Sequence, residues 1–189
     1  MTLANYITFF RIAMIPVIAL AIAFFTVDDQ AFRLAAAVIY MIVALSDWAD
    51  GIIARKFDQR SRLGERLDPT ADKLLTNITL VFIAVNPHFA IPIPMWLPVV
   101  VMLRDSTILI GSYLAHRFFG PLKPRARVLG KVTAWTQGIT IAGVLLQAPV
   151  AAHLIWVMVV VTAVSFIDYC LFGYERVIPE MAPPMKESH

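Results

Sequence analysis

The stretch that decides the fold is the run AFRLAAAVIYMIVALSDWADGIIARKF, residues 31–57. It begins as an apolar segment that Arg33 alone interrupts, and acidic residues appear only toward its end, at Asp47 and Asp50. A bilayer core of about 30 Å takes roughly 20 helical residues to cross, so the run is long enough to span a membrane as one helix. Charged residues inside such a helix are costly and usually functional. The run therefore predicts a transmembrane helix with a polar site at one end.

The rest of the chain has the same character. Its 189 residues are 59% hydrophobic and 15% charged, whereas a soluble domain usually carries about a quarter charged residues. The mean hydropathy is +0.74. Basic residues border apolar stretches instead of forming a solvated patch, so nucleic acid is not an expected partner. We predict an all-α integral membrane protein, a six-transmembrane-helix bundle within residues 1–175 and a disordered cytoplasmic tail at 176–189; the expected spans are 5–26, 31–55, 67–86, 95–117, 128–147 and 150–173.

Lys and Arg in short connections mark the cytoplasmic side of a membrane protein. They gather at 56–66, at 120–127 and in the tail, and the opposite connections hold almost none, with Arg33 as the exception. Both termini are therefore expected in the cytoplasm. The acidic end of the second span should face the same side, and the expected location is a bacterial inner membrane.

The acidic residues follow helical spacing on two consecutive spans. On the second span they occupy positions i and i+3 with small residues at i+4 and i+7, and on the third they recur every four residues, so each set shares one helix face. The short connection predicts that the two helices are antiparallel and adjacent, with their acidic faces opposed. The two faces consist of Asp47, Asp50, Gly51 and Ala54, and of Gly64, Asp68 and Asp72.

Four carboxylates in one pocket would repel one another unless they were protonated or neutralised. Hard divalent cations such as Mg²⁺ or Mn²⁺ bind all-oxygen sites of this kind, together with substrate phosphates. Structural ion pairs would account for one or two of these acids, but poorly for four. A small ion-coupled transporter would more often place its acids near the midplane or in repeated halves, and no repeat is visible. An aromatic prenyltransferase usually has a longer chain and two separate Asp-rich motifs.

The motif resembles the signature of the CDP-alcohol phosphotransferase (CDP-alcohol phosphatidyltransferase) family, D-x₂-D-G-x₂-A-R-x₈-G-x₃-D-x₃-D. The segment with Asn5, Thr8 and Arg11, followed by Pro16, is similar to the family's N-terminal segment, and six spans are its usual core. The fixed positions of the signature are all matched, by Asp47, Asp50, Gly51, Ala54, Arg55, Gly64, Asp68 and Asp72.

The resemblance implies an enzyme of phospholipid biosynthesis that works as a homodimer in the membrane. The four aspartates would hold two metal ions, Mg²⁺ or Mn²⁺, that clamp the diphosphate of CDP-diacylglycerol. Asp72 would also act as the general base on the hydroxyl of the acceptor, whose oxygen attacks the β-phosphorus and releases CMP. The residues implied to bind the CDP group are Asn5, Thr8, Gly51, Ala54, Arg55 and Gly64.

The acceptor is expected to meet a group of basic residues. Phosphatidylglycerophosphate synthases of the family use glycerol 3-phosphate, and the segments around Asp72 and Lys131 resemble that branch. Arg104-Asp105 is instead similar to the family's cardiolipin synthases, which use phosphatidylglycerol. We favour glycerol 3-phosphate and keep phosphatidylglycerol as the alternative. The candidate acceptor-binding residues are Arg104, Arg117, Arg125, Arg127 and Lys131.

Overall fold

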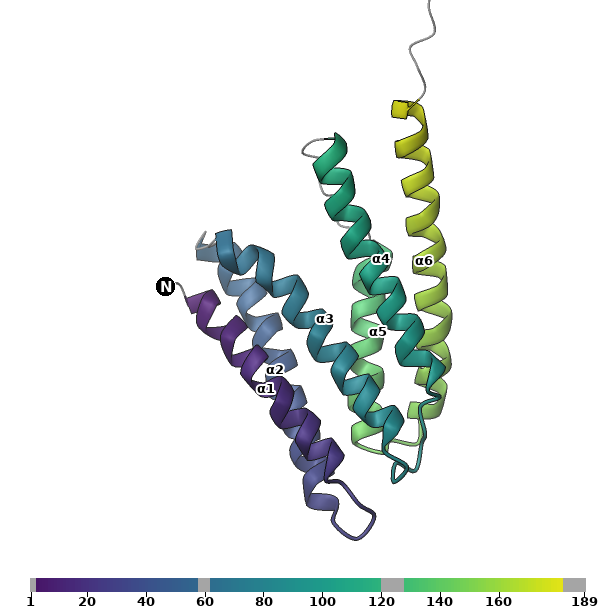
Figure 1. Cartoon of the computed structure of the whole chain (residues 1–189). Helices are drawn as coiled ribbons and strands as arrows, with labels where there is room; N and C mark the ends of the chain where they lie inside the picture. Colours follow the sequence, from purple (N-terminus) through teal and green to yellow (C-terminus); the bar gives the residue numbers. More distant parts are fainter. Residues whose placement is uncertain (1–2, 58–61, 120–127, 182–189) are drawn as a thin grey trace, which may run out of the picture.

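The described part of the chain consists of six α-helices and contains no strand, so the all-α prediction is confirmed for it (Figure 1). The computed structural model describes residues 3–57, 62–119 and 128–181, with side chains in 8–46, 70–114, 117 and 128–171. The helices are α1 Leu3–Ala23, α2 Gln30–Phe57, α3 Arg62–Val85, α4 Trp96–Phe119, α5 Val128–Leu145 and α6 Ala151–Met181.

Two helices extend well past the predicted spans. α3 begins at Arg62 instead of 67, and α6 ends at Met181 instead of 173. Hydropathy marks only the apolar part of a helix, whereas Leu, Arg and Glu continue the helical backbone readily in polar surroundings. The segment expected to be a tail from 176 therefore begins as helix, and residues 182–189 lie outside the described residues.

Local hydrogen bonds explain two of the helix ends. Asp29 precedes α2, and its Oδ1 accepts a hydrogen bond from the backbone N–H of Ala31 at 3.1 Å, which is an N-cap. After α5, the N–H of Gln147 donates to Val144 O and that of Ala148 donates to Gly143 O, both at 2.9 Å. This pair of bonds is a Schellman motif, and it places Gln147 in the left-handed region with φ of 53°.

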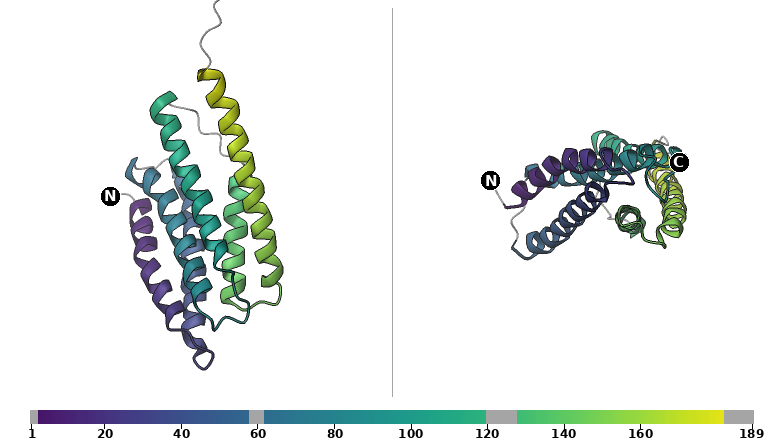
Figure 2. Two further views of the ribbon diagram at one scale, coloured as in Figure 1. Left: turned by 45° about the vertical axis from the view of Figure 1, so that its right-hand side comes forward. Right: turned by 90° about the horizontal axis from the view of Figure 1, so that it is seen from below.

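The buried core lies toward the end of the bundle that holds the connections α1–α2, α3–α4 and α5–α6. From that end, α1–α3 and α4–α6 diverge toward the end where the N-terminus lies (Figures 1 and 2). α3 joins the two groups, since it contacts α1 on one side and α4 and α5 on the other. Several of the largest fully buried side chains come from α1, the residues just after it, α3 and α5. They include Ile18 and Ile22 of α1, Phe25 after α1, Leu80 and Ile83 of α3, and Ile141 and Leu145 of α5.

Two helices have windows long and apolar enough to cross a membrane, Trp96–Leu114 and Ala151–Leu171, as judged over the described residues. Only 28% and 22% of these windows are buried inside the protein. Their exposed residues include large apolar side chains, among them Leu103 and Val160. α1 and α2 contribute shorter apolar stretches, Thr8–Ala23 and Gln30–Ser46.

Arg33, the exception to the charge pattern, has a structural role. Its side chain is buried, and it donates one hydrogen bond to the backbone carbonyl of Leu145 and another to Gln30 Oε1 at 2.9 Å. Leu145 is the last residue of α5, where carbonyl groups lack helical partners and a cation is favourable. Arg33 therefore ties the start of α2 to the end of α5.

Candidate active site

The acidic motif lies on two antiparallel helices. α2 ends and α3 begins at the same end of the bundle (Figure 1). Contacts join α1 to both helices, and α5 also contacts both. Most of the side chains on the two acidic faces lie outside the described residues, so the opposition of these faces stays a prediction.

α2 and α3 border a cavity of about 400 Å³, and residues of α1 and α5 also line it. Asp72 of α3 lines it and is half-buried. Arg11 of α1 and Tyr40 of α2 also line it, and both are almost completely buried. Asp72 interacts electrostatically with the Tyr40 phenol. One predicted catalytic residue therefore reaches a cavity formed by four helices; its other lining residues include Val43, Ala44, Leu75, Thr76, Trp135 and Gly138.

Helical register relates the remaining acids to this cavity. Asp68 precedes Asp72 by four residues in α3, and Asp47 follows the cavity-lining Val43 by four residues in α2. Residues four apart lie on one face of a helix, so the signature continues the two faces that border the cavity. The side chains of Asn5, Asp47, Asp50, Gly51, Ala54, Arg55, Gly64 and Asp68 lie outside the described residues, and their assigned roles stay predictions.

Thr8, the other residue predicted to bind CDP, is described. Its side chain is buried on α1, one turn before Arg11, and it takes part in an interaction within the protein. Thr8 does not line the cavity that contains Asp72. The structure therefore places Thr8 near that cavity on the same helix, and its predicted contact with CDP stays a prediction.

The donor chemistry of the cavity fits a hard cation. Asp72, Tyr40 and Thr76 contribute oxygen atoms, and neither His nor Cys is among the described residues that line the cavity. Oxygen donors suit Mg²⁺ and Mn²⁺. Within the described residues there is no group of three or more His, Cys, Asp and Glu side chains close enough to hold a metal ion. A complete site would need the signature's other three aspartates.

A second polar cluster lies on the side of α3 that faces α4. Asp105 of α4 accepts a hydrogen bond from Arg104 Nη1 at 2.7 Å, and its Oδ1 also lies 3.2 Å from Lys73 Nζ. Arg104 Nη2 donates to Ser165 Oγ of α6. Arg104 and Asp105 are 4% and 2% exposed, so their charges are compensated inside the protein. Asp105 is therefore the counter-ion of Arg104, and it also pairs with Lys73.

This cluster borders a second cavity of about 230 Å³, which lies between α3, α4, α5 and α6. Of the predicted acceptor residues that the structure describes, Arg104 alone lines it, next to Lys73, Asp168 and Tyr169. Lys131 is exposed beside the lining residue Gly130, and Arg117 is exposed near the end of α4. Arg125 and Arg127 lie outside the described residues.

Sequence reasoning missed Lys73, Tyr40 and Ser165. Lys73 carried the strongest signal, because it directly follows Asp72 and lies in the same polar helix segment. Tyr40 and Ser165 sit in apolar runs, where a single hydroxyl-bearing residue is unremarkable. Only the three-dimensional arrangement shows that they face charged partners.

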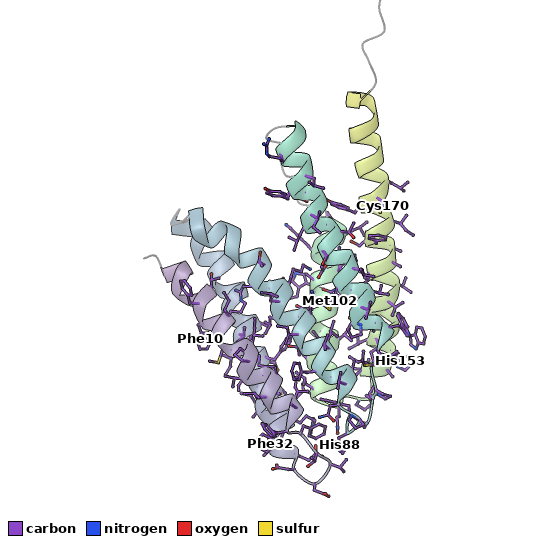
Figure 3. The ribbon with its side chains drawn as sticks, in the orientation of Figure 1. Phe10, Phe32, His88, Met102, His153 and Cys170 are labelled. Atoms are coloured by element: carbon purple, nitrogen blue, oxygen red, sulfur yellow. The ribbon has the colours of Figure 1, made fainter. Side chains whose placement is uncertain are left out.

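The described histidines take no part in either cluster. His88 lies between α3 and α4 and His153 lies near the start of α6, both toward the end of the bundle that holds the core (Figure 3). The ring of His88 makes an edge contact with Phe25, at 6.4 Å between centroids. His88 therefore packs against the core, away from both clusters.

Comparison with known proteins identifies the class. A sequence model of the CDP-alcohol phosphatidyltransferase family matches residues 1–164 of this chain. The chain therefore belongs to the CDP-alcohol phosphatidyltransferase family, as the signature on α2 and α3 predicted.

The relatives are more specific. The CDP-diacylglycerol–glycerol-3-phosphate 3-phosphatidyltransferase of Bacillus subtilis (strain 168) is 33% identical over 190 residues, covering 92% of this chain and 95% of the relative. The protein of the same name from Escherichia coli (strain K12) is 30% identical over 174 residues, covering 86% and 90%. An Arabidopsis thaliana protein of that name, numbered 2, is 39% identical over 149 residues, covering 74% of this chain and 62% of the relative.

Proposed function

We propose that this chain transfers the phosphatidyl group of CDP-diacylglycerol to glycerol 3-phosphate, forming phosphatidylglycerophosphate and releasing CMP. The observation that carries the proposal is the position of Asp72. This last residue of the family signature lines a cavity between four helices, and the next residue of α3, Lys73, lies 3.2 Å from Asp105 in the cluster that contains Arg104. The relatives named for this reaction support the choice of acceptor. The match covers nine-tenths or more of each of the two bacterial relatives.

The proposed chemistry needs a base and an in-line nucleophile. Asp72 accepts the proton of the acceptor hydroxyl, and the resulting oxygen nucleophile forms a bond to the β-phosphorus. The bond from that phosphorus to the bridging oxygen breaks, and CMP leaves with the bridging oxygen. Positioned base catalysis of this kind typically contributes about 10²- to 10⁴-fold in rate.

Asp47, Asp50, Asp68 and Asp72 would hold Mg²⁺ or Mn²⁺. When bound, such ions neutralise charge on the diphosphate and on the leaving group. The family signature and the oxygen donors that Asp72, Tyr40 and Thr76 offer to the cavity support this assignment. The chain's own contribution is to keep Asp72 half-buried beside Tyr40 and Arg11, where solvent screens electrostatic interactions less than at an exposed site.

Arg104 is the proposed recognition residue for the phosphate of glycerol 3-phosphate. A guanidinium group binds phosphate through several N–H donors at once. Arg104 lines the second cavity, and its Nε has no hydrogen-bond partner among the described residues. Phosphatidylglycerol, the alternative acceptor, also carries a phosphate, so Arg104 alone does not separate the two substrates.

The proposal includes a six-span bundle with both termini in the cytoplasm, and a homodimer. α2 ends, α3 begins, α4 ends and α5 begins at the end of the bundle where the N-terminus lies, which agrees with the basic connections (Figure 1). Trp96 and Trp156, near the starts of α4 and α6, are exposed, as expected of residues that anchor helices at a membrane interface. Reporter fusions to each terminus should both report a cytoplasmic location.

The direct test is transfer of radiolabelled glycerol 3-phosphate into organic-soluble lipid by the purified protein. Transfer that requires CDP-diacylglycerol and Mg²⁺ is the expected result. If label stays in the aqueous phase while the same preparation converts phosphatidylglycerol to cardiolipin, the acceptor assignment is wrong.

A further inference from the structure

We propose that Asp105 is a positioning residue for the transfer reaction. By holding Lys73, it fixes the rotation of α3 about its axis, and so it keeps the Asp72 carboxylate in its cavity. The inference rests on the proposed function, because it assumes that Asp72 is the base. It assigns a role in the reaction to two residues, Lys73 and Asp105, that the family signature does not include.

The first step is the geometry of two consecutive residues. Neighbouring residues on an α-helix point about 100° apart around the axis. Asp72 lines the cavity between α1, α2, α3 and α5, whereas Lys73 lines the two cavities on the side of α4. Any rotation of α3 that moves Lys73 relative to α4 therefore moves Asp72 within its cavity.

The second step is the rigidity of the anchor. Asp105 is 2% exposed, and a single oxygen, Oδ1, meets both Arg104 Nη1 and Lys73 Nζ. Arg104 is held in turn by Ser165 of α6. A carboxylate that served only as the counter-ion of Arg104 would not need a second cation from another helix. The contacts instead connect α3 to α4 and, through Arg104, to α6.

The third step is the size of the effect. The Cα atoms of a helix lie about 2.3 Å from its axis and a carboxylate lies further out, so a rotation of about 20° would move it on the order of 1–2 Å. A misplacement of about 1 Å can cost a reaction on the order of 100-fold in rate. Loss of the ion pair should therefore lower kcat, with little effect on the binding of CDP-diacylglycerol.

The chain offers a matched control at the other end of α3. Asn86 directly follows α3, and its Nδ2 donates to the carbonyls of Ile22 and Phe25 at 2.7 and 3.0 Å. This contact ties α3 to the end of α1 and does not involve either cavity that contains Asp72 or Arg104. Asn86→Ala removes an interhelical contact of α3 without releasing Lys73.

The experiment compares CMP release by Asp105→Asn, Asp105→Glu, Lys73→Met and Asn86→Ala with both substrates saturating, together with the KM for CDP-diacylglycerol. We expect Asp105→Asn to lower kcat about 10- to 100-fold with that KM changed less than about threefold. Asp105→Glu should recover most of the loss. Lys73→Met should lower kcat similarly, and adding it to Asp105→Asn should cost little more, because the two residues act as one unit. Asn86→Ala should lower the unfolding temperature and leave kcat unchanged.

Wild-type kcat in Asp105→Asn, an equal fall of kcat in Asn86→Ala, or additive losses in the double variant would each overturn the inference. If Asp105→Asn does not fold, Lys73→Met decides the matter, since wild-type kcat in that variant would also overturn it. Absence of CMP release from the wild-type protein would instead contradict the proposed function.

Discussion

Lys73 Nζ on α3 lies 3.2 Å from Asp105 Oδ1 on α4, and Lys73 directly follows Asp72, the proposed base. α3 therefore presents consecutive residues to two different polar clusters. One cluster contains the acid of the family signature and the other contains the buried Arg104. This arrangement puts the proposed chemistry and the proposed acceptor recognition on neighbouring faces of one helix.

Replacement of the base should separate chemistry from binding. Asp72→Asn keeps the size of the side chain but removes its ability to take a proton, so we expect CMP release to fall at least about 100-fold. Binding of CDP-diacylglycerol, measured by equilibrium titration, should change much less. Asp28→Asn, in the exposed connection between α1 and α2, is the control for loss of an aspartate and should be fully active. An Asp72→Asn variant with near wild-type turnover would remove Asp72 from the base role.

Loss of Arg104 should affect the acceptor more than the lipid donor. Truncation of one member of a buried charge pair typically costs about 2–5 kcal/mol, and about 1.4 kcal/mol corresponds to a tenfold change in affinity. We expect Arg104→Ala to raise the KM for glycerol 3-phosphate at least about tenfold, and the KM for CDP-diacylglycerol by much less. Steady-state kinetics with each substrate varied in turn would measure both values. Equal changes in the two KM values would argue against acceptor recognition by Arg104.

Removal of divalent cations should abolish turnover reversibly. The four aspartates would otherwise repel one another and leave the diphosphate charge uncompensated. We expect EDTA to stop CMP release, and either Mg²⁺ or Mn²⁺ in excess to restore it. Full activity in EDTA, with no metal found by elemental analysis of the protein, would contradict the metal assignment.

Gln147 offers a prediction about stability alone. Its φ of 53° lies in the left-handed region, which costs a residue with a side chain roughly 1–2 kcal/mol and costs glycine little. Gln147→Gly keeps both backbone bonds of the Schellman motif and should raise the unfolding temperature by a few degrees, as measured in detergent. Gln147→Ala, which keeps a Cβ, is the control and should give no such gain. A lower unfolding temperature for the glycine variant would mean that the Gln147 side chain makes a stabilising contact.

The sequence allowed the prediction of helix number, helix order and family, because apolar length and fixed acidic spacing are local properties of a chain. It did not allow the prediction of which helices touch. α2 and α3 were expected to be adjacent, but nothing in the sequence indicated that α1 and α5 would each contact both of them. Packing partners depend on the shapes of whole helix surfaces, which spacing rules do not encode.

Arg33 and Arg104, two of the three buried arginines among the described residues, illustrate the same limit. Sequence reasoning identified Arg104 as a candidate acceptor-binding residue, and the structure pairs it with Asp105, its neighbour in the chain. The partner of Arg33 is the carbonyl of Leu145, 112 residues away, and the second cation on Asp105 comes from another helix. Contacts between distant segments could not be predicted from the sequence. This holds even for Lys73, which directly follows the predicted base Asp72.

The most direct test of the proposed function is CMP release by the purified, detergent-solubilised protein with CDP-diacylglycerol and Mg²⁺. Glycerol 3-phosphate and phosphatidylglycerol would be supplied in separate reactions, with Asp72→Asn as the inactive reference. We predict release with glycerol 3-phosphate, formation of phosphatidylglycerophosphate in equal amount, and no release with phosphatidylglycerol. Release with phosphatidylglycerol alone would contradict the assigned acceptor and would make the protein a cardiolipin synthase of the same family.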